Sequence, residues 1–367
     1  MKHHDHTVLV LQGGGALGAY QAGVYEGMTE RGITPDWVTG VSIGAINGAL
    51  IAGNPVERRL ERLREFWDRV SSGNPLATLA DFEPLRTGLN RLSALAAATF
   101  GVPGFFSPRI PPPLFARDGT PGALSIYDTA PLRKTLEDLI DFDLLNHRQR
   151  VRLSVGAVHV TTGNSIYFDN RDHGITVDHI IASGSLPPGF PAITIDGEQY
   201  WDGGLVSNSP LWYVLDDAPD ISALILQVDL FSAKGQLPDN LDQVQERAKD
   251  IQYSSKTRFN TKRGQELENM RLALDRLLKK IPRELHADAD YKLLQQRIGS
   301  KRQITIAHLI NRRFGHYTNS KDYEFSRATV RQLWAAGLED VRRTCAHTEW
   351  ARALTPVDGM QVFDLSR

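Results

Sequence analysis

The sequence predicts a three-layer α/β/α fold with a mainly parallel central sheet and a helical extension at its C-terminal end. Continuous apolar runs such as residues 7–12 and 223–228 are typical of buried parallel strands. Segments with helical spacing alternate with these runs, which favours a sheet covered by helices on both faces. The composition agrees, because 41% of the 367 residues are hydrophobic and 23% are charged, as in a globular enzyme with a large core.

Charge and cysteine content narrow the class of protein further. The net charge is -1, so the chain lacks the basic surplus of a nucleic-acid-binding protein, and we expect no nucleic-acid partner. Cys345 is the single cysteine, which excludes an intrachain disulfide and favours a cytoplasmic location. No apolar run approaches the roughly 18 residues of a membrane-spanning helix. Any membrane contact is therefore expected to be peripheral and transient.

The first fifty residues follow a strand–loop–helix–strand–turn–helix pattern. The apolar run 7–12 leads into a glycine-rich loop at 13–18, and residues 19–31 have the spacing of an amphipathic helix. A second strand near Trp37 leads to a tight turn and then to a helix of small residues at 45–52. This order is the opening of a three-layer α/β fold.

Regular α/β structure resumes after residue 124. An Asp196-Gly197 pair between two alternating segments is typical of a tight hairpin turn. The remaining expected elements of the core are helices at 58–70, 131–140 and 177–183, strands at 151–160, 165–168 and 223–228, and a hairpin at 193–201.

The segment 73–124 is expected to be a lid or insertion. Its part from 89 to 115 combines small apolar residues with many prolines, which argues against a regular core element. This part has too many large apolar groups for a freely solvated loop: Phe100, Phe105, Phe106, Leu114 and Phe115. We therefore predict that they cover the reactive site and line an acyl channel; the alternative is a loop that seals an edge of the sheet.

We divide the chain into a core at 7–230 and a mostly helical extension at 231–367 that packs on it. Residues 241–285 are helical and charge-rich, and residues 303–309 have the character of a late strand. Two helices of the extension carry apolar stripes, which we expect to pack in the core. The stripes are Leu267, Met270, Leu274, Leu277 and Ile281 on one helix, and Val330, Trp334, Leu338, Val341 and Cys345 on the other.

Residues 40–44 read Gly-Val-Ser-Ile-Gly and lie between a strand and a helix. In this context a G-x-S-x-G turn lifts the hydroxyl of Ser42 out of the backbone, and the flanking glycines avoid clashes in the strained turn. The start of the following helix adds amide donors and a positive dipole end near the serine oxygen. The motif indicates a nucleophilic serine.

The glycine loop has two interpretations. It fits the G-x-G-x-x-G pattern of a dinucleotide site, but that site needs an acidic residue at the end of the second strand, and Asp36 lies at its start. The loop also suits an oxyanion hole, because consecutive glycines let several amides point at one spot. Adjacent parallel strands would bring the loop beside Ser42, which favours the second interpretation.

A serine nucleophile needs a base, and Asp202 is the best candidate. It follows the hairpin and precedes two glycines, which make a turn that can present a carboxylate into a cleft. None of the eleven histidines has a comparable setting.

Four segments in order resemble the patatin-like phospholipase family: the glycine loop 13–18, the turn 40–44, the Ala-Ser…Pro…Phe-x-Pro segment 182–191 and Asp202-Gly203-Gly204. The resemblance covers roughly residues 7–230; the last third resembles an extension of a bacterial branch. It implies a patatin-like fold and a Ser42–Asp202 dyad that cleaves acyl esters without a metal or cofactor. The expected oxyanion donors are Gly13, Gly14, Gly15 and Ile43. The expected substrate contacts are Phe100, Phe105, Phe106 and Phe190.

One departure and three alternatives stay open. Many family members carry a basic residue where this chain has Leu17, which puts a preference for phosphate headgroups in doubt more than ester cleavage. The substrates could instead be thioesters or hydroxyalkanoate oligomers, or the protein could be a silent lipid-binding relative. An acyltransferase of the malonyl-transfer type would need a histidine base such as His147, whose setting lacks strand–turn character. Oligomeric state is not indicated.

Overall fold

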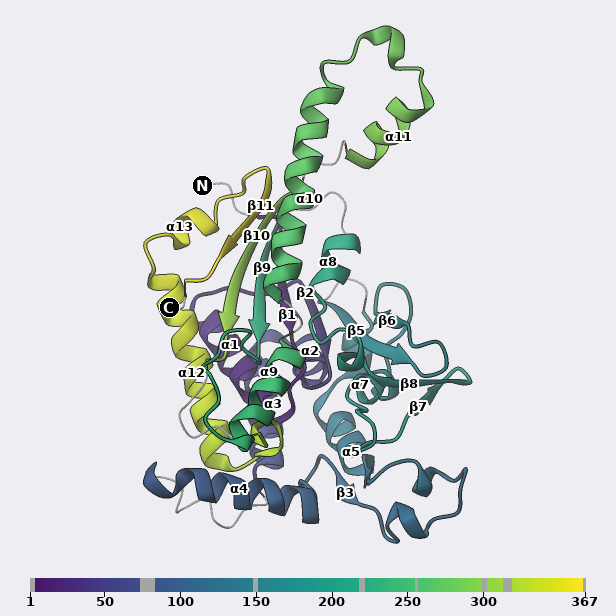
Figure 1. Ribbon diagram of the computed structural model, residues 1–367, viewed down its shortest axis with the longest axis vertical. Helices are drawn as coiled ribbons and strands as arrows, with labels where there is room; N and C mark the ends of the chain where they lie inside the picture. Colours follow the sequence, from purple (N-terminus) through teal and green to yellow (C-terminus); the bar gives the residue numbers. More distant parts are fainter. Residues whose placement is uncertain are drawn as a thin grey trace.

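The protein is organised around one large mixed sheet (Figure 1). The computed structural model describes residues 4–72, 83–147, 151–217, 222–254, 257–298, 302–312 and 319–365. Within these residues the sheet has nine strands in the order β11-β10-β9-β1-β2-β5-β8-β7, and β6 pairs with β5. The strands are β1 His6–Leu11, β2 Trp37–Val41, β5 Arg152–His159, β6 Ser165–Asp169, β7 Ile193–Ile195, β8 Glu198–Asp202, β9 Ser222–Asp229, β10 Gln303–Ile310 and β11 Gly359–Phe363.

The six strands from β11 to β5 are parallel, and the antiparallel pairs lie at the β5 side. This arrangement confirms the predicted mainly parallel sheet. The predicted hairpin is also present, because β7 and β8 pair around Asp196 and Gly197, both of which have positive φ. A separate two-stranded sheet joins β3 Ser107–Pro108 to β4 Tyr127–Asp128.

Helices cover both faces of the sheet. Successive side chains of a strand point to opposite faces, so the apolar residues of β1 need a packed core on each side. Leu9 and Leu11 belong to the larger core with α1, α2, α7 and α12, whereas Val8 and Val10 belong to a smaller core with α8. The helices are α1 Ala19–Glu30, α2 Ile43–Ala52, α3 Val56–Val70, α4 Glu83–Phe100, α5 Ala130–Leu139, α6 Phe142–Leu145, α7 Val177–Ser183, α8 Leu211–Asp217, α9 Leu241–Tyr253, α10 Thr257–Leu278, α11 Ala289–Ile298, α12 Arg327–Ala346 and α13 Trp350–Ala353.

The expectation that the segment 89–115 contains no regular element was wrong for its first part. Its residues up to Phe100 belong to α4, which begins at Glu83. The prolines that argued against a helix begin at Pro103, whereas the run of alanines before Phe100 has high helix propensity. Gly101, with φ of 83°, ends the helix. Residues 73–82 of the predicted insertion lie outside the described residues.

The extension is less purely helical than expected, because it supplies two strands to the central sheet. The predicted late strand is β10, and β11 follows it in parallel pairing. Within the part of the chain that the structure covers, no helix combines the length and apolar character needed to cross a membrane.

The two apolar stripes of the extension differ in how far they are buried. On α12, Val330 and Val341 are buried against α1, as expected. On α10, Leu267, Met270 and Leu277 are about half exposed, so the expectation of core packing was wrong there. Periodicity identifies an apolar face but does not say what covers it.

Candidate active site

Ser42 occupies a strained turn between β2 and α2. Its φ and ψ are 57° and -124°, a region that side chains other than glycine rarely adopt. Only glycines fit on either side of it. A Cβ atom on Gly40 would lie 2.3 Å from the backbone of Gly44, and one on Gly44 would lie 2.4 Å from the carbonyl oxygen of Leu11. The G-x-S-x-G pattern therefore corresponds to a real steric requirement.

Ser183, the last residue of α7, holds this turn in place. Its hydroxyl accepts a hydrogen bond from the amide of Ser42 at 2.9 Å and donates one to the carbonyl of Gly156 at 2.6 Å. The hydroxyl is fully buried, so both bonds are protected from water. The Ala182-Ser183 pair, singled out in the sequence by its resemblance to a family segment, thus positions the backbone of Ser42.

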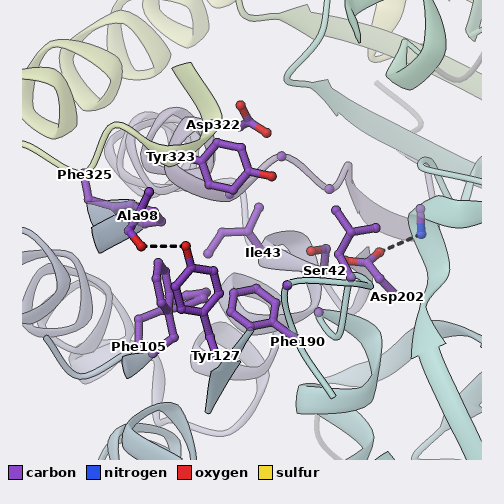
Figure 2. Close-up of a pocket in the computed structure, with 18 of the residues that line it drawn as sticks. Ser42, Ile43, Ala98, Phe105, Tyr127, Phe190, Asp202, Asp322, Tyr323 and Phe325 are labelled. Carbon is purple, nitrogen blue, oxygen red and sulfur yellow. Dashed lines mark hydrogen bonds between the residues drawn. The ribbon is translucent and has the colours of Figure 1, made fainter. Parts of the chain in front are cut away.

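The sheet brings Asp202 to Ser42 from 160 residues away. β5 lies between β2 and β8, and Val41 pairs with Gly156 while Asp202 pairs with Ala157. Because β8 runs antiparallel to β5, its last residue returns to the level at which β2 ends. Figure 2 shows the Asp202 carboxylate beside the Ser42 hydroxyl, and this hydroxyl lowers the pKa of the carboxyl group.

The environment of Asp202 raises its proton affinity. The side chain is only 3% exposed. Burial raises the pKa of Asp202 to about 6, against the opposing effects of the nearby Ser42 hydroxyl and of the hydrogen bond from the Gly204 amide. The Gly204 amide lies 2.7 Å from the carboxylate and fixes its orientation. A carboxylate with this pKa is far better matched to proton transfer near neutral pH than an exposed aspartate.

The glycine loop is fixed from two sides. The amide of Gly13 donates to the carbonyl of Asn208 at 3.2 Å, and the Asn208 side chain donates back to the carbonyl of Gly13 at 3.0 Å. Gly15 has φ of 55°, and a Cβ atom there would lie 2.3 Å from the carbonyl oxygen of Asp322. Since the Gly13 amide is already bonded, Gly14, Gly15 and Ile43 remain as the expected oxyanion donors, and all three residues line the cavity described next.

A cavity of about 640 Å³ opens over Ser42 and is mostly apolar. Phe105, Phe106 and Phe190 line it as expected, and their rings form one aromatic cluster with Tyr127 (Figure 2). The expectation for Phe100 was wrong, because it is 79% exposed and does not line the cavity. It is the last residue of α4, and its ring is largely in solvent.

Helix α4 forms one wall of this cavity, with Arg91, Ala94, Leu95 and Ala98 facing it. The helix is tied to its surroundings: Tyr127 donates to the carbonyl of Ala98 at 2.7 Å, Ser93 donates to Glu324 at 2.5 Å, and Arg91 pairs with Asp242 at 3.1 Å. Of the segment that we expected to cover Ser42, α4, Phe105 and Phe106 thus line the cavity, while its role as a lid stays a prediction. Leu114 and Phe115, which were expected to line the channel, are instead exposed on the surface.

Sequence reasoning missed the contribution of the C-terminal extension to the cavity. Its side chains form a further part of the cavity wall, and they are Phe231, Asp242, Tyr253, Ser320, Asp322, Tyr323 and Phe325. Phe325 packs on Phe105 with ring centroids 5.6 Å apart. Buried Lys321, which bonds Asp250 at 2.5 Å, anchors this wall to α9. Nothing in the local sequence around 320–325 indicates proximity to Ser42.

No histidine is found among the described residues that line the cavity. His147 is exposed. Asp36 contacts His6 at 3.3 Å and lies just before the amino-terminal end of β2, whereas Ser42 lies just after its carboxyl-terminal end. Leu17, which replaces the basic residue of many relatives, is fully buried.

Fold and site together define an α/β protein with a serine elbow, an adjacent buried aspartate and a glycine loop beside them. The chain belongs to the patatin-like phospholipase family, whose model matches residues 9–215. A second family model, described as patatin phospholipase, matches residues 251–357 and so covers most of the extension.

Individual relatives are distant. The chain is 27% identical over 226 residues to a cGAMP-activated phospholipase of Escherichia coli, covering 55% of this chain and 53% of that protein. A 65-residue match to a lysophospholipase of Aspergillus terreus is 46% identical and covers 17% and 4% of the two chains. The chain thus spans about half or less of these relatives.

Solved structures with similarity include VipD from Legionella pneumophila and the SpcU–ExoU complex from Pseudomonas aeruginosa. Their identities to this chain are 14% and 16%, and their TM-scores are 0.33 and 0.28. The alignments cover 91% of this chain and 67% of VipD, and 93% of this chain and 78% of the chain from the complex.

Proposed function

We propose that the protein is a serine hydrolase of lipid acyl esters that uses Ser42 as nucleophile and Asp202 as base. The observation that carries the proposal is the position of the Ser42 hydroxyl beside the carboxylate of a buried aspartate (Figure 2), where both residues line an apolar cavity. The phospholipase and lysophospholipase names of its relatives support the same class of reaction.

The reaction proceeds in two acyl-transfer steps. The Ser42 oxygen bonds to the ester carbonyl carbon while its proton passes to Asp202, and the amides of Gly14, Gly15 and Ile43 stabilise the oxyanion. When the C–O ester bond breaks, Asp202 returns the proton to the leaving alcohol. Water then attacks the acyl-serine with Asp202 again as base, the acid leaves, and the proton returns to Ser42.

The cavity favours a long acyl chain as the part of the substrate that it binds. Its walls are mainly aromatic and aliphatic. Apart from Asp202, the charged groups on its border are paired, since Arg91 meets Asp242 and Asp322 meets Lys249. Apolar pockets of this size bind mainly through burial of hydrocarbon surface. Thioesters and hydroxyalkanoate oligomers present the same electrophilic carbonyl, so a substrate panel must separate these from lipid esters.

Filling the cavity from α4 should change chain-length preference. Ala98 lines the cavity but is exposed, so Ala98→Phe adds bulk without overpacking the core. We expect kcat/KM for long-chain p-nitrophenyl esters and lysophospholipids to fall about tenfold or more, while that for the acetyl ester changes little. Thr99→Phe, at an exposed neighbour that does not line the cavity, is the matched control. Equal losses for long and short esters would contradict the assignment of the cavity to the acyl chain.

The pH dependence of turnover should report Asp202. Because the base must be ionised to accept the proton, kcat/KM is expected to rise with pH through about 6 and to level off above it. Burial raises the pKa of Asp202, so the inflection of the pH profile lies at a higher pH than it would for an exposed aspartate. A pH profile with a neutral ester as substrate checks this. An inflection near 4, or a descending limb in this range, would contradict the role of Asp202 as base.

A further inference from the structure

Helix α10 carries an apolar face that the rest of the described chain leaves open. Leu267, Met270, Leu274 and Leu277 are 46%, 54%, 39% and 57% exposed. Together with Ile281 just beyond the helix, these residues are called the α10 seam below. Half-exposed large apolar side chains in a continuous row are uncommon on a monomer surface.

The other side of α10 is fully used within the chain. Gly264 packs against Met360 of β11, Glu268 is buried, and Arg271 donates to Glu268 and to the carbonyl of Ile298 in α11. At 100° per residue, the α10 seam lies on the side of the helix roughly opposite Glu268. Folding of this chain therefore accounts for the inner side of α10 and leaves the seam without a partner among the described residues.

The spacing of the α10 seam is that of a two-stranded coiled coil. The intervals between successive seam residues alternate strictly between three and four, which is the a/d pattern of a heptad. A helix that only covers a globular core usually has a broader apolar face. Figure 1 shows that α10 runs outward from the sheet and that α11 folds back beside it, so the two form an arm that projects from the body.

We propose that the α10 seam pairs with the α10 seam of a second copy of this chain in an antiparallel, two-fold symmetric contact. In that arrangement Leu267 faces Leu277 of the second copy, and Met270 faces its Leu274. Ala273, a small residue on the flank of the seam, lies near the two-fold axis, where the helices approach closely. In a two-fold symmetric contact, the same apolar patch of each copy is buried against that of the other, so one self-complementary surface is enough.

Charge selects the antiparallel direction. On the solvent side of the seam, Glu266 lies in α10 near one end and Lys280 lies in the turn that follows the other end, and both residues are exposed. Antiparallel pairing places Glu266 opposite Lys280 of the second copy, once on each side of the axis. Parallel pairing would instead place Glu266 opposite Arg271, whose guanidinium already pairs with Glu268 at 2.6 Å. Antiparallel pairing therefore gives both flanking charges a partner across the contact, in addition to Lys262, which lies 3.9 Å from Glu266 in the same helix.

Sedimentation velocity of the full chain at about 1 to 100 µM tests the contact. We expect the wild-type protein to be dimeric at the upper end of this range. Leu274→Glu should weaken association on the order of a hundredfold, because it places a charge in the seam at an exposed position that the fold does not need. Leu237→Glu, at a 90% exposed leucine outside the seam, is the matched control and should not alter association.

A charge exchange tests the direction. Glu266→Lys alone and Lys280→Glu alone should each weaken association several-fold to about tenfold, and the double variant should restore it. In a parallel dimer Lys280→Glu would have no effect and the double variant would not recover. A wild-type protein that is monomeric throughout the range, including one whose α10 seam binds lipid vesicles instead, would overturn the proposal; so would equal effects of Leu274→Glu and Leu237→Glu.

Discussion

Replacement of Ser42 by alanine is expected to lower ester hydrolysis on the order of 10,000-fold or more and to leave the fold intact. The hydroxyl is the atom that forms the acyl bond, and no other described hydroxyl shares the contact with Asp202. Alanine should fit this turn as well as serine does, because the turn is held by the hydrogen bond from the backbone amide of residue 42 to the Ser183 hydroxyl. The measurement is kcat on long-chain and acetyl esters, together with the melting temperature.

A nearby serine supplies the control for this change. Ser207 lies in the loop after Asp202 but does not border the cavity, and its hydroxyl donates to the carbonyl of Ser209. Ser207→Ala should therefore keep most of the activity. Residual turnover above a few per cent in a folded Ser42→Ala protein would remove Ser42 from the reaction.

Asp202→Asn is expected to be nearly as damaging as Ser42→Ala, with the double variant little worse than either. The amide can still accept a hydrogen bond from Gly204, so the geometry is retained while the ability to take a proton is lost. Residues that act as one unit have non-additive effects, so the three variants should show similar turnover. If the losses multiplied instead, Asp202 and Ser42 would be acting independently.

The same variant should become more stable at pH 7. Burial raises the folded-state pKa of Asp202 from 3.8 to about 6, so the unfolded chain releases the proton more readily and the ionised side chain disfavours folding above pH 6. Removal of that charge should raise the free energy of unfolding at pH 7 by about 1–3 kcal/mol, with the gain disappearing as pH falls toward 4. Activity lost together with stability lost would instead indicate a structural role.

The sequence was most informative where local chemistry determines structure. Buried parallel strands are continuous apolar runs, and the Asp196-Gly197 pair predicts its hairpin because both residues must adopt positive φ. The positions of Ser42 and of the glycine loop also followed from the sequence. Both lie at the carboxyl ends of the neighbouring parallel strands β1 and β2, where Leu11 pairs with Gly40.

The misses share a physical cause, which is long-range packing. Tyr323 and Phe325 reach the cavity because Lys321 is buried against α9 and Asp322 meets Gly15, contacts between segments far apart in the chain. Neither residue stands in a local pattern that differs from ordinary core packing. The exposure of Leu274 on α10 is a miss of the same kind, because spacing shows that a face is apolar without showing its partner.

The segment around α4 failed for a different reason. Residues 89–115 include both the end of an alanine-rich helix, which stops at Phe100, and a proline-rich loop, which begins at Pro103. The composition of the whole segment therefore does not describe either part. The helix-breaking residues were real, but they act only on their own side of Gly101. Phe105 and Phe106 in the loop line the cavity, whereas Phe100 at the helix end does not.

Covalent labelling with a fluorophosphonate, followed by peptide mapping, tests the central claim most directly. The probe reports a serine that is nucleophilic in the folded chain, whatever the natural substrate is. We expect one label, on Ser42, at a rate that rises with pH through about 6, and we expect no label at that position in Ser42→Ala and very slow labelling in Asp202→Asn. A folded wild-type protein that stays unlabelled, or that is labelled at another residue, would contradict the account.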